Sequence, residues 1–352
     1  MYKPKYTITN TILKNIGIIE ASREVIDHAP LLPYYEKKFQ SDAIIRAVHF
    51  GTHIEGNELN LSQAEKVMAG QEVVARERDV QEVINYRKAM EEIGKGQRAK
   101  GREKITEELV NHLHELTTDK ILPPERCGKY RETQVVVKNS LTGEVTFRPP
   151  IALSVPIQIR DLYAFINSTT DQDIHSVLKS GIVHFEFVRI HPFIDGNGRV
   201  ARCLATLILF QEGYDIRKFF SLEEYFDNDP TGYYTALQSV EKNSGDMTEW
   251  LTYYTQGLAI ELAKIKEKVE VISVDGKLRE KLGGVPLMLS ERQLKIIEYI
   301  QKTGYLQNSG FKQLFPFVSE DTVLNELKLL IQTGLLRKTG KTKAAKYIME
   351  TT

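Results

Sequence analysis

The residues with the clearest chemical potential stand together in one run of the chain. Residues 191–202 read His-Pro-Phe-Ile-Asp-Gly-Asn-Gly-Arg-Val-Ala-Arg. His191 can take up a proton near neutral pH, as a general base must. Asp195 supplies a carboxylate, the hard oxygen ligand that Mg²⁺ prefers when it also binds phosphates. A base and a metal ligand so close in sequence indicate chemistry at a phosphate group.

The same run can also bind the phosphates themselves. The glycines of 196–198 allow successive backbone N–H groups to converge on an anion. Arg199 and Arg202 are three residues apart and share one face of a helix that follows the turn. The N-terminus of that helix adds a favourable dipole. The alternative is an ordinary turn between two buried helices, with His191 and Asp195 as incidental surface groups.

Helices must position this run, because helical periodicity dominates the chain and alternating strand patterns are scarce. We expect a capping box of Ser62 and Glu65 at the start of one of these helices. The expected fold class is mainly α. The expected helices cover 10–27, 40–50, 61–68, 80–93, 105–116, 155–167, 172–190, 198–211, 230–243 and 246–268.

One region, 133–148, departs from the helical pattern and predicts a β-hairpin. Residues 133–137 and 144–147 flank a turn that contains Gly143, and two prolines end the pattern at 149–150. The exposed edge of such a hairpin can hold a peptide segment as an added strand. A hairpin without a binding role is the alternative.

The end of the chain predicts a separate unit after a Gly-rich linker at 271–288. We expect a helix opened by a capping box of Ser290 and Gln293, a short helix at 311–315, a third helix capped by Ser319, and two strands over 334–348. Three helices followed by a strand–turn–strand wing outline a winged helix-turn-helix domain over 289–352. The residues expected to face inward are Leu294, Ile297, Ile300, Val323, Leu327, Leu330 and Ile331.

Length and composition limit the classes of function. The chain has 352 residues, enough for a main domain and smaller units, and its formal net charge of zero gives no global attraction to nucleic acid or membranes. The two cysteines, Cys127 and Cys203, lie far apart and favour a reduced, cytoplasmic protein. The N-terminus lacks the apolar core of a signal peptide, and the longest apolar run, 203–210, is too short to span a bilayer. We therefore expect no membrane association.

Residues 191–202 resemble the signature of the Fic-domain family, HPFxDGNGR followed by xxR, and match it at every fixed position. The resemblance implies a Fic-type helical bundle with a β-hairpin flap. It places the catalytic core at 105–270 and a family-type helical extension at 1–104. The segment 128–131, Gly-Lys-Tyr-Arg, is similar to the one that leads into the flap of family members. So complete a match disfavours the ordinary turn as the explanation of the run.

The resemblance also implies the reaction, which is transfer of a nucleoside monophosphate, usually AMP from ATP, to a hydroxyl of a target protein. In that reaction His191 takes the proton from the target hydroxyl, Asp195 holds Mg²⁺, and Phe193 packs inward to anchor the loop. Gly198 favours nucleotidyl transfer, because kinases of the family carry Lys there. The residues implied to bind nucleotide are Gly196, Asn197, Gly198, Arg199, Val200, Ala201 and Arg202.

A second motif lies upstream, at His53-Ile-Glu-Gly-Asn57. It resembles the inhibitory motif (S/T)xxxE(G/N) of autoinhibited Fic proteins, in which a Glu pairs with the second signature Arg and blocks the γ-phosphate site. Here that pair would be Glu55 and Arg202. The Ser/Thr position of the motif falls on Gly51, so the match depends on 55–57. In some relatives the same Glu supports hydrolytic removal of AMP. The alternative is a solvated Glu at a helix end.

The resemblance suggests further contacts. Tyr233 and Tyr234 stand where family members often carry a pair of tyrosines near the nucleotide base. Aromatic pairs on helices, however, usually belong to the hydrophobic core. Likewise, His184 is expected to be a core histidine. The target protein would present Ser, Thr or Tyr to the flap at 133–148. The sequence does not decide between a monomer and a homodimer.

The expected function is therefore that of a Mg²⁺- and ATP-dependent protein adenylyltransferase, autoinhibited by Glu55. The alternative is a DNA-binding regulator whose Fic core senses nucleotide or modifies a partner. Basic residues of the wing could contact DNA phosphates, or the wing could contact protein. These basic residues are Arg337, Lys338, Lys341, Lys343 and Lys346.

Overall fold

The computed structural model describes residues 2–29, 31, 33–95, 104–138, 145–168, 174–272, 290–316, 318–340 and 345–350. The chain divides into a larger unit, Met1–Ala29 with Lys38–Glu270, and a smaller unit, Pro30–Lys37 with Val271–Thr352. Most of the linker expected at 271–288 lies outside the described residues, as does residue 289, the first of the expected winged helix domain.

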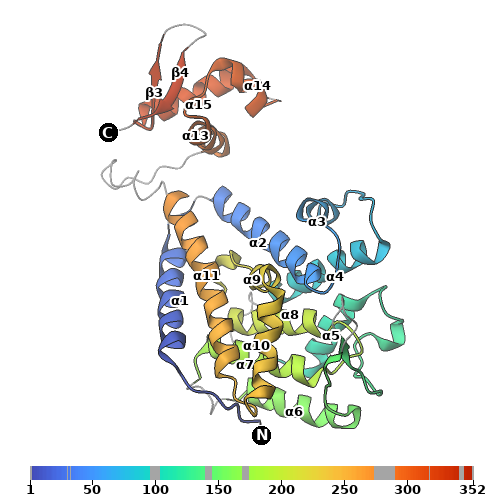
Figure 1. The fold of residues 1–352 in the computed structure, drawn as a ribbon. Helices are drawn as coiled ribbons and strands as arrows, with labels where there is room; N and C mark the ends of the chain where they lie inside the picture. The colour runs from blue at the N-terminus through green and yellow to red at the C-terminus, as the bar shows by residue number, and fades with distance from the viewer. Residues whose placement is uncertain are drawn as a thin grey trace. The chain divides into compact units, whose positions relative to one another are not determined.

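Helices build the larger unit (Figure 1). Two of them form its centre. The first, α7, packs against α6 and α8, and α8 packs in addition against α4 and α5. The helices are α1 Asn10–His28, α2 Pro33–His53, α3 Leu61–Met68, α4 Glu77–Lys95, α5 Glu107–Thr118, α6 Val155–Ile166, α7 Ser176–Ile190, α8 Asn197–Gln211, α9 Leu222–Asn228, α10 Pro230–Lys242 and α11 Thr248–Ile272.

The two central helices are buried on almost every side, which explains their sequences. A helix that is apolar around its whole circumference belongs in a core, and the run 203–210 reads this way within α8. Trp250 of α11 is fully buried and donates from its indole N–H to the carbonyl of Gly181 in α7, at 2.8 Å. The mainly helical fold expected from the sequence is confirmed, and α7 and α8 are the frame for the loop between them.

Several expected boundaries need correction. The helix expected at 40–50 begins at Pro33, since proline is favoured in a first helical turn. The capping box of α3 is formed by Asn60 and Gln63, two residues before the pair expected, Ser62 and Glu65. The short helix α9 has no counterpart among the expected elements, because seven residues carry too little periodicity to be recognised.

The expected hairpin is present but short. Strand β1, Val137–Lys138, pairs antiparallel with β2, Val145–Phe147. Val137 faces Phe147 in the register, and the ladder is irregular at Lys138. The turn expected around Gly143 falls in 139–144, outside the described residues.

The smaller unit contains α13 Glu291–Thr303, α14 Phe311–Leu314, α15 Glu320–Gln332, β3 Leu336–Thr339 and β4 Lys346–Met349. The predicted capping box of Ser290 and Gln293 is confirmed, and Ser319 caps α15 as predicted. The two strands are antiparallel and pair Leu336 with Met349 at one end. Buried apolar side chains from all three helices and both strands form one core, which includes Ile297, Ile300, Val323, Leu327 and Leu330, with Ile331 partly buried against it.

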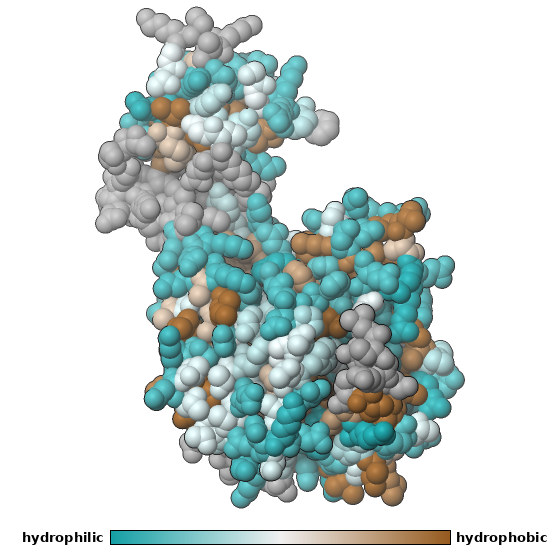
Figure 2. Space-filling view, viewed as in Figure 1, coloured by the Kyte–Doolittle hydropathy of each residue, from teal (hydrophilic) through white to brown (hydrophobic). Residues whose placement is uncertain are grey.

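The surface of the molecule is mostly hydrophilic in the view of Figure 2, with apolar side chains in separate patches. Within the described ranges, no helix is long and apolar enough to cross a membrane. Both cysteines are free thiols: Cys203 is buried in α8 and Cys127 is partly buried.

Candidate active site

The run 191–202 forms a sharp loop between α7 and α8. His191 ends α7 in the left-handed region, with φ of 52°, and Gly196 has φ of 76° just before α8 begins. A left-handed backbone at a residue other than glycine is strained by about 1–3 kcal/mol, so its surroundings must hold it in place. The carbonyl of His191 accepts a hydrogen bond of 2.8 Å from Nε of Arg131, which supplies part of that restraint.

Arg131 ties the base of the flap to this loop. Its side chain is 4% exposed, and it also donates to the carbonyl of Pro150, which follows β2, at 2.6 Å. Its own backbone N–H donates to the carbonyl of Pro192 at 2.8 Å. The segment 128–131 was expected only to lead into the flap. The buried guanidinium shows that it fixes the flap relative to His191.

The imidazole of His191 is held in one orientation and is neutral at neutral pH. Its Nδ1 lies 3.2 Å from the carbonyl oxygen of Val188, so Nδ1 must be the donor and Nε2 carries the lone pair in the neutral ring. Burial lowers the pKa of His191 to about 4. At neutral pH the ring is therefore unprotonated and can accept a proton without first losing one.

Inside the loop, Asn197 acts as an internal brace. Its Oδ1 accepts from the backbone N–H of Phe193 at 2.8 Å, and its Nδ2 donates to the carbonyl of the same residue at 3.0 Å. Phe193 is fully buried, as predicted, and stacks on the ring of His114 at 3.7 Å between centroids. The Asn197 side chain therefore shapes the loop, a role that the sequence reasoning missed.

His114 of α5 is a second brace that the sequence did not reveal. Its Nδ1 accepts from the backbone N–H of Gly128 at 2.8 Å, so its Nε2 carries the proton and donates to the carbonyl of Asp195 at 3.0 Å. Burial lowers the pKa of His114 to about 4, which keeps this tautomer neutral. A histidine inside an apolar helical pattern offers no signal for such a role.

Asp195 presents its carboxylate at the surface of the loop, 36% exposed at the side chain. Its Oδ1 accepts from the N–H of Gly196 at 2.6 Å, while Arg199 lies 3.5 Å and Arg78 3.1 Å from the two oxygens. Burial would raise the pKa of Asp195, but Arg199, the Gly196 N–H and Arg78 outweigh it and hold the pKa below its ordinary value.. The described residues hold no group of three or more metal-ligating side chains. One ionised carboxylate fits Mg²⁺, which usually completes its shell with phosphates and water.

Glu55, just beyond the end of α2, lies against both signature arginines. Its Oε1 is 2.6 Å from Nη2 of Arg202, and its Oε2 is 3.0 Å from Nε of Arg199 in an ion pair. Arg199 and Arg202 are 2% and 3% exposed, whereas the Glu55 side chain is 23% exposed, so this cluster of three residues, hereafter the Glu55 cluster, joins two buried guanidinium groups to a partly exposed carboxylate. Burying charges is favourable only when they are paired, and Glu55 supplies the pairing.

The carboxylate of Glu55 also covers the first turn of α8. A Cβ built on Gly198 would lie 2.2 Å from its Oε1, so any side chain at 198 would displace the carboxylate from this position. The N-terminus of a helix is an anion site because its N–H groups and dipole attract negative charge. Glu55 occupies that region with its own negative charge.

The packing around residue 51 explains why glycine stands at the Ser/Thr position of the motif that the sequence resembles. A Cβ there would come within 2.4 Å of the Tyr86 ring, so the packing of α4 against α2 demands glycine. The carbonyl of Gly51 accepts from Nη2 of Arg202 at 2.7 Å, which gives Arg202 a contact without a side chain at this position. The hydroxyl of the neighbouring Thr52 instead donates within α2, to the carbonyls of Val48 and His49.

Two residues of α4 extend the charge network, and neither was predicted. Glu82 accepts from Arg78 at 3.1 Å and from Nδ2 of Asn57 at 3.0 Å, and it lies 3.6 Å from Nη1 of Arg199. Arg78 in turn bridges Glu82 to Asp195. The charged run of 76–82 was the only sequence signal, and it is indistinguishable from a solvated helix face.

A cavity of about 540 Å³ opens over this loop. The predicted site residues that line it are His191, Asp195, Gly196, Asn197, Gly198, Arg202, Glu55, Tyr233 and Tyr234. Val200 and Ala201 are fully buried and do not line it, nor does Arg199. Phe147 and Pro150 bring the base of the flap to its wall.

The two tyrosines that line the cavity differ in burial. Tyr233 is 2% exposed, and its hydroxyl lies 2.9 Å from Nε2 of His184, which is fully buried as expected. Tyr234 is 43% exposed. Of the two, Tyr234 therefore has more accessible surface for a ligand.

Comparisons with known proteins find one family and several relatives. Residues 104–209 match the model of the Fic/DOC family. Protein adenylyltransferase fic-1 of Caenorhabditis elegans is 29% identical over 209 residues, which are 59% of this chain and 39% of that protein. Protein adenylyltransferase Fic of Nematostella vectensis is 25% identical over 213 residues, 59% of this chain and 48% of that protein. The chain thus spans less than half the length of these relatives.

Solved structures show the same fold. A Fic family protein from Desulfovibrio desulfuricans G20 superposes with a TM-score of 0.68 at 23% identity, over 99% of this chain and 98% of that chain. Fic-1 of Caenorhabditis elegans, residues 134–508, gives a TM-score of 0.60 at 21% identity, over 74% of each chain. At these identities the likeness concerns the fold.

Proposed function

We propose that this protein transfers AMP from ATP to a hydroxyl side chain of a target protein. The observation that carries the proposal is a neutral, oriented imidazole, His191, on the wall of one cavity with the Asp195 carboxylate and the N-terminus of α8. The relatives named as protein adenylyltransferases support it at the level of the domain.

In the proposed reaction, the target hydroxyl oxygen attacks the α-phosphorus of ATP and the bond to the pyrophosphate breaks. His191 Nε2 takes the hydroxyl proton, while Nδ1 stays bound to the carbonyl of Val188 and keeps the ring in position. Asp195 would hold Mg²⁺, which neutralises phosphate charge when bound. Positioning and charge stabilisation supply most of the catalysis in such transfers.

A buried donor without an acceptor supports phosphate binding at this place. Nε of Arg202, a residue that lines the cavity, is buried and finds no hydrogen-bond acceptor among the described residues. Buried donors without acceptors are costly, and an anionic ligand satisfies them. The first turn of α8 supplies further N–H groups, in the region that Glu55 now covers.

We infer further that the arrangement described is an inhibited one. Glu55 accepts a hydrogen bond that Arg202 would otherwise donate to phosphate, and it places negative charge where the outer phosphates of ATP would lie. ATP and Glu55 therefore compete for one site. Because Glu55 lines the same cavity as His191, it could also orient a water for removal of AMP, which makes hydrolysis a second activity of the same site.

Residues 289–352 are proposed to form a winged helix domain that contacts protein. The order of α13, α14, α15, β3 and β4 supports the fold. Arg337 and Lys338 of β3 are exposed, as a DNA-binding wing would need, while Lys341 and Lys343 lie outside the described residues. Glu320 and Asp321, however, stand in the first turn of α15, the helix that would enter the major groove. Their charge would oppose DNA phosphates, which favours protein over the DNA-binding alternative.

Labelled ATP tests the proposed function. The full chain is incubated with a cell extract, Mg²⁺ and ATP that carries label on either the α- or the γ-phosphate, with Glu55→Gly as a second sample. Relative to extract without the protein, label in protein should increase from the α-phosphate and should not increase from the γ-phosphate. An increase from the γ-phosphate, or none from either with Glu55→Gly, would contradict AMP transfer.

A further inference from the structure

The chain turns sharply just after Glu55. Gly56 has φ of 97°, and its N–H donates to the carbonyl of His53 at 2.8 Å. The N–H of Asn57 donates to the carbonyl of Thr52 at 3.3 Å. These two bonds form a Schellman motif, which ends a helix at a residue with a left-handed backbone. The motif fixes the direction of the backbone on both sides of Glu55 and makes Asn57 the first residue beyond the turn.

The side chain of Asn57 joins this turn to α4. Asn57 is 3% exposed, and its Nδ2 donates to the carbonyl of Asp79 and to Oε2 of Glu82, each at 3.0 Å. Its Oδ1 accepts from the N–H of Leu59 at 3.1 Å. Both N–H donors and the oxygen of the amide therefore have partners. The bond to Glu82 is the strongest of them in kind, because its acceptor is ionised.

Glu82 contacts the Glu55 cluster from the other side as well. Its side chain is 9% exposed. While Oε2 accepts from Asn57, Oε1 accepts from Nε of Arg78 at 3.1 Å and lies 3.6 Å from Nη1 of Arg199. One carboxylate thus contacts both the segment that follows Glu55 and an arginine with which Glu55 pairs. Because both contacts come from one side chain, Glu82 fixes how the two lie relative to each other.

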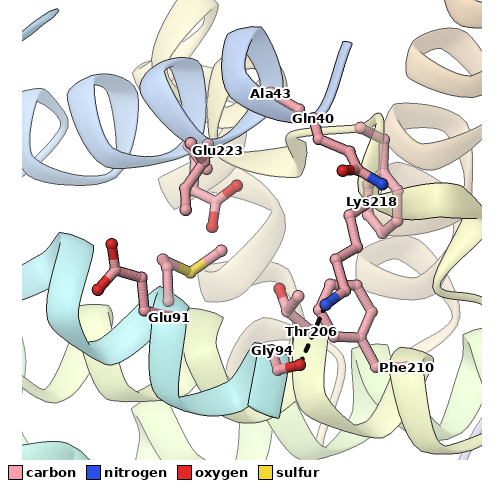
Figure 3. Close-up of a pocket in the computed structure, with 12 residues that line it drawn as sticks. Gln40, Ala43, Glu91, Gly94, Thr206, Phe210, Lys218 and Glu223 are labelled. Carbon is pink, nitrogen blue, oxygen red and sulfur yellow. Dashed lines mark hydrogen bonds between the residues drawn. The ribbon is translucent and has the colours of Figure 1, made fainter. Parts of the chain in front are cut away.

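Earlier in α2, packing against α4 is interrupted. Both helices line a cavity of about 370 Å³, and Figure 3 shows Ala43 of α2 on one side of it and Gly94 of α4 on the other. Side chains at a void lack partner atoms there, so they contribute less to holding two helices together. The contacts of Gly51 and Asn57 with α4 lie beyond this cavity, towards Glu55. They therefore matter most for the position of the end of α2.

We propose that Asn57 and Glu82 form a latch that positions the Glu55 carboxylate on Arg202 and over the first turn of α8. Both residues act through Glu55, since neither is among the described residues that line the cavity of His191. On the proposed function, which this role requires, the latch sets how strongly Glu55 excludes the outer phosphates of ATP. When the latch opens, the turn after α2 loses its hold on α4 and Glu55 can leave the arginines.

Asn57→Asp breaks the latch with almost no change of shape. The new carboxylate can still accept from the N–H of Leu59, but it has no donor for the carbonyl of Asp79 or for Glu82. It also places a second negative charge beside the Glu82 carboxylate, and like charges at this distance repel.

Asn60→Asp is the matched control, three residues farther along the chain. Oδ1 of Asn60 caps α3 by accepting from the N–H of Gln63 at 2.9 Å, and a carboxylate oxygen preserves that bond. The same chemical change is therefore made outside the latch.

Hydrogen exchange of the full chain without nucleotide tests the latch itself. The N–H groups of Gly56 and Asn57 are hydrogen-bonded in the turn. After correction for intrinsic rates, the peptide that covers them should exchange roughly tenfold faster in Asn57→Asp than in wild type, because a bond to a charged group is lost. Asn60→Asp should exchange there as wild type does. Equal exchange in Asn57→Asp and wild type overturns the latch.

Binding of a non-hydrolysable ATP analogue with Mg²⁺ tests what the latch does. Asn57→Asp should bind the analogue roughly tenfold more tightly than wild type, and no more tightly than Glu55→Gly. In the Glu55→Gly background, Asn57→Asp should change nothing, because the latch acts only through Glu55. A residue that merely stabilised the fold would instead weaken binding in both backgrounds. No gain in affinity, or the same change in both backgrounds, overturns the positioning role.

Asn57→Ala adds no charge and keeps both tests decisive if Asn57→Asp does not fold, with urea unfolding followed by Trp250 fluorescence as the check. An analogue that binds neither wild type nor Glu55→Gly would count against the proposed function. Hydrogen exchange would still decide in that case whether the latch holds the turn.

Discussion

The larger unit buries charged groups around a cavity, whereas the smaller unit buries almost only apolar side chains. In the larger unit Arg131, Arg199 and Arg202 are each under 5% exposed. In the described part of the smaller unit, the buried polar residues are Gln293 and Glu326, at 7% and 8%. Buried charge is costly unless it is paired, so a fold that only had to be stable would avoid it. The buried charges therefore favour the larger unit as the place of the reaction, whereas the apolar core of the smaller unit is what stability alone requires.

The largest expected effect removes the base. His191→Ala should lower the rate of α-phosphate label transfer about 10²–10⁴-fold, the usual contribution of a general base. Nucleotide binding should persist, because His191 contributes no phosphate contact in the proposed site. Initial rates and analogue affinity are measured on the same preparations. Labelling by His191→Ala close to the wild-type rate would remove His191 from the mechanism.

A matched pair of core substitutions tests whether the units are energetically separate. Leu204 of α8 and Leu327 of α15 are both fully buried, and replacement by Ala should destabilise the unit concerned by roughly 2–5 kcal/mol. Trp250, the single tryptophan, lies in the larger unit, so its fluorescence in urea reports that unit alone. We expect Leu204→Ala to shift the urea transition seen by Trp250 fluorescence. Leu327→Ala should change neither this transition nor the rate of label transfer. A shift with Leu327→Ala would show that the two units unfold together.

On the proposed function, removal of the Glu55 carboxylate should raise activity. Glu55→Gly leaves Arg202 without its carboxylate partner, so the arginine becomes available to phosphate, and we expect roughly a tenfold to hundredfold higher rate of label transfer. Arg202→Ala should be slow both alone and in combination with Glu55→Gly, because the phosphate partner is lost in either background. Equal rates for Glu55→Gly and wild type would mean that Glu55 does not inhibit and is only a residue at the end of a helix.

The sequence predicted the helices of the smaller unit better than it predicted the site residues of the larger one. The apolar spacing and caps of the smaller unit predicted its helices, because local patterns decide how a simple core packs. In the larger unit the signature residues were identified, but His114, Arg78 and Glu82 were missed. They reach the loop from α4 and α5, more than 70 residues upstream, and only the packing of the helices brings them there. Sequence spacing carries no record of such long-range contacts.

The glycine at the motif position offers a smaller effect with a direct control. Gly51→Ala places a methyl group against Tyr86 in a close-packed interface and should destabilise the larger unit by about 1–3 kcal/mol. Gly17 of α1 has open space around its Cβ position, so Gly17→Ala should be neutral or stabilise by up to about 1 kcal/mol. Urea unfolding followed by Trp250 fluorescence measures both. Equal effects of the two substitutions would mean that the contact with Tyr86 is not the reason for glycine at 51.

The mildest test uses pH, and it again separates the two units. All eight histidines lie before residue 192, so the smaller unit contains none. Burial lowers the pKa of His114 to about 4 and that of His184 to about 3, below the value of about 6.5 expected in the unfolded chain. Below pH 6.5 the unfolded chain therefore binds more protons than the folded one, and stability falls as the pH falls. From pH 6.5 to 5, each of these histidines should lower the free energy of unfolding by roughly 1–2 kcal/mol, in a range where most carboxylates stay ionised.

Urea unfolding tests this expectation. The urea midpoint from Trp250 fluorescence should drop over this pH range, while the transition of the smaller unit, followed by circular dichroism, should hardly move. His184→Phe should flatten the dependence of the larger unit on pH, and a slope as steep as that of wild type would show that His184 is not one of the groups that titrate.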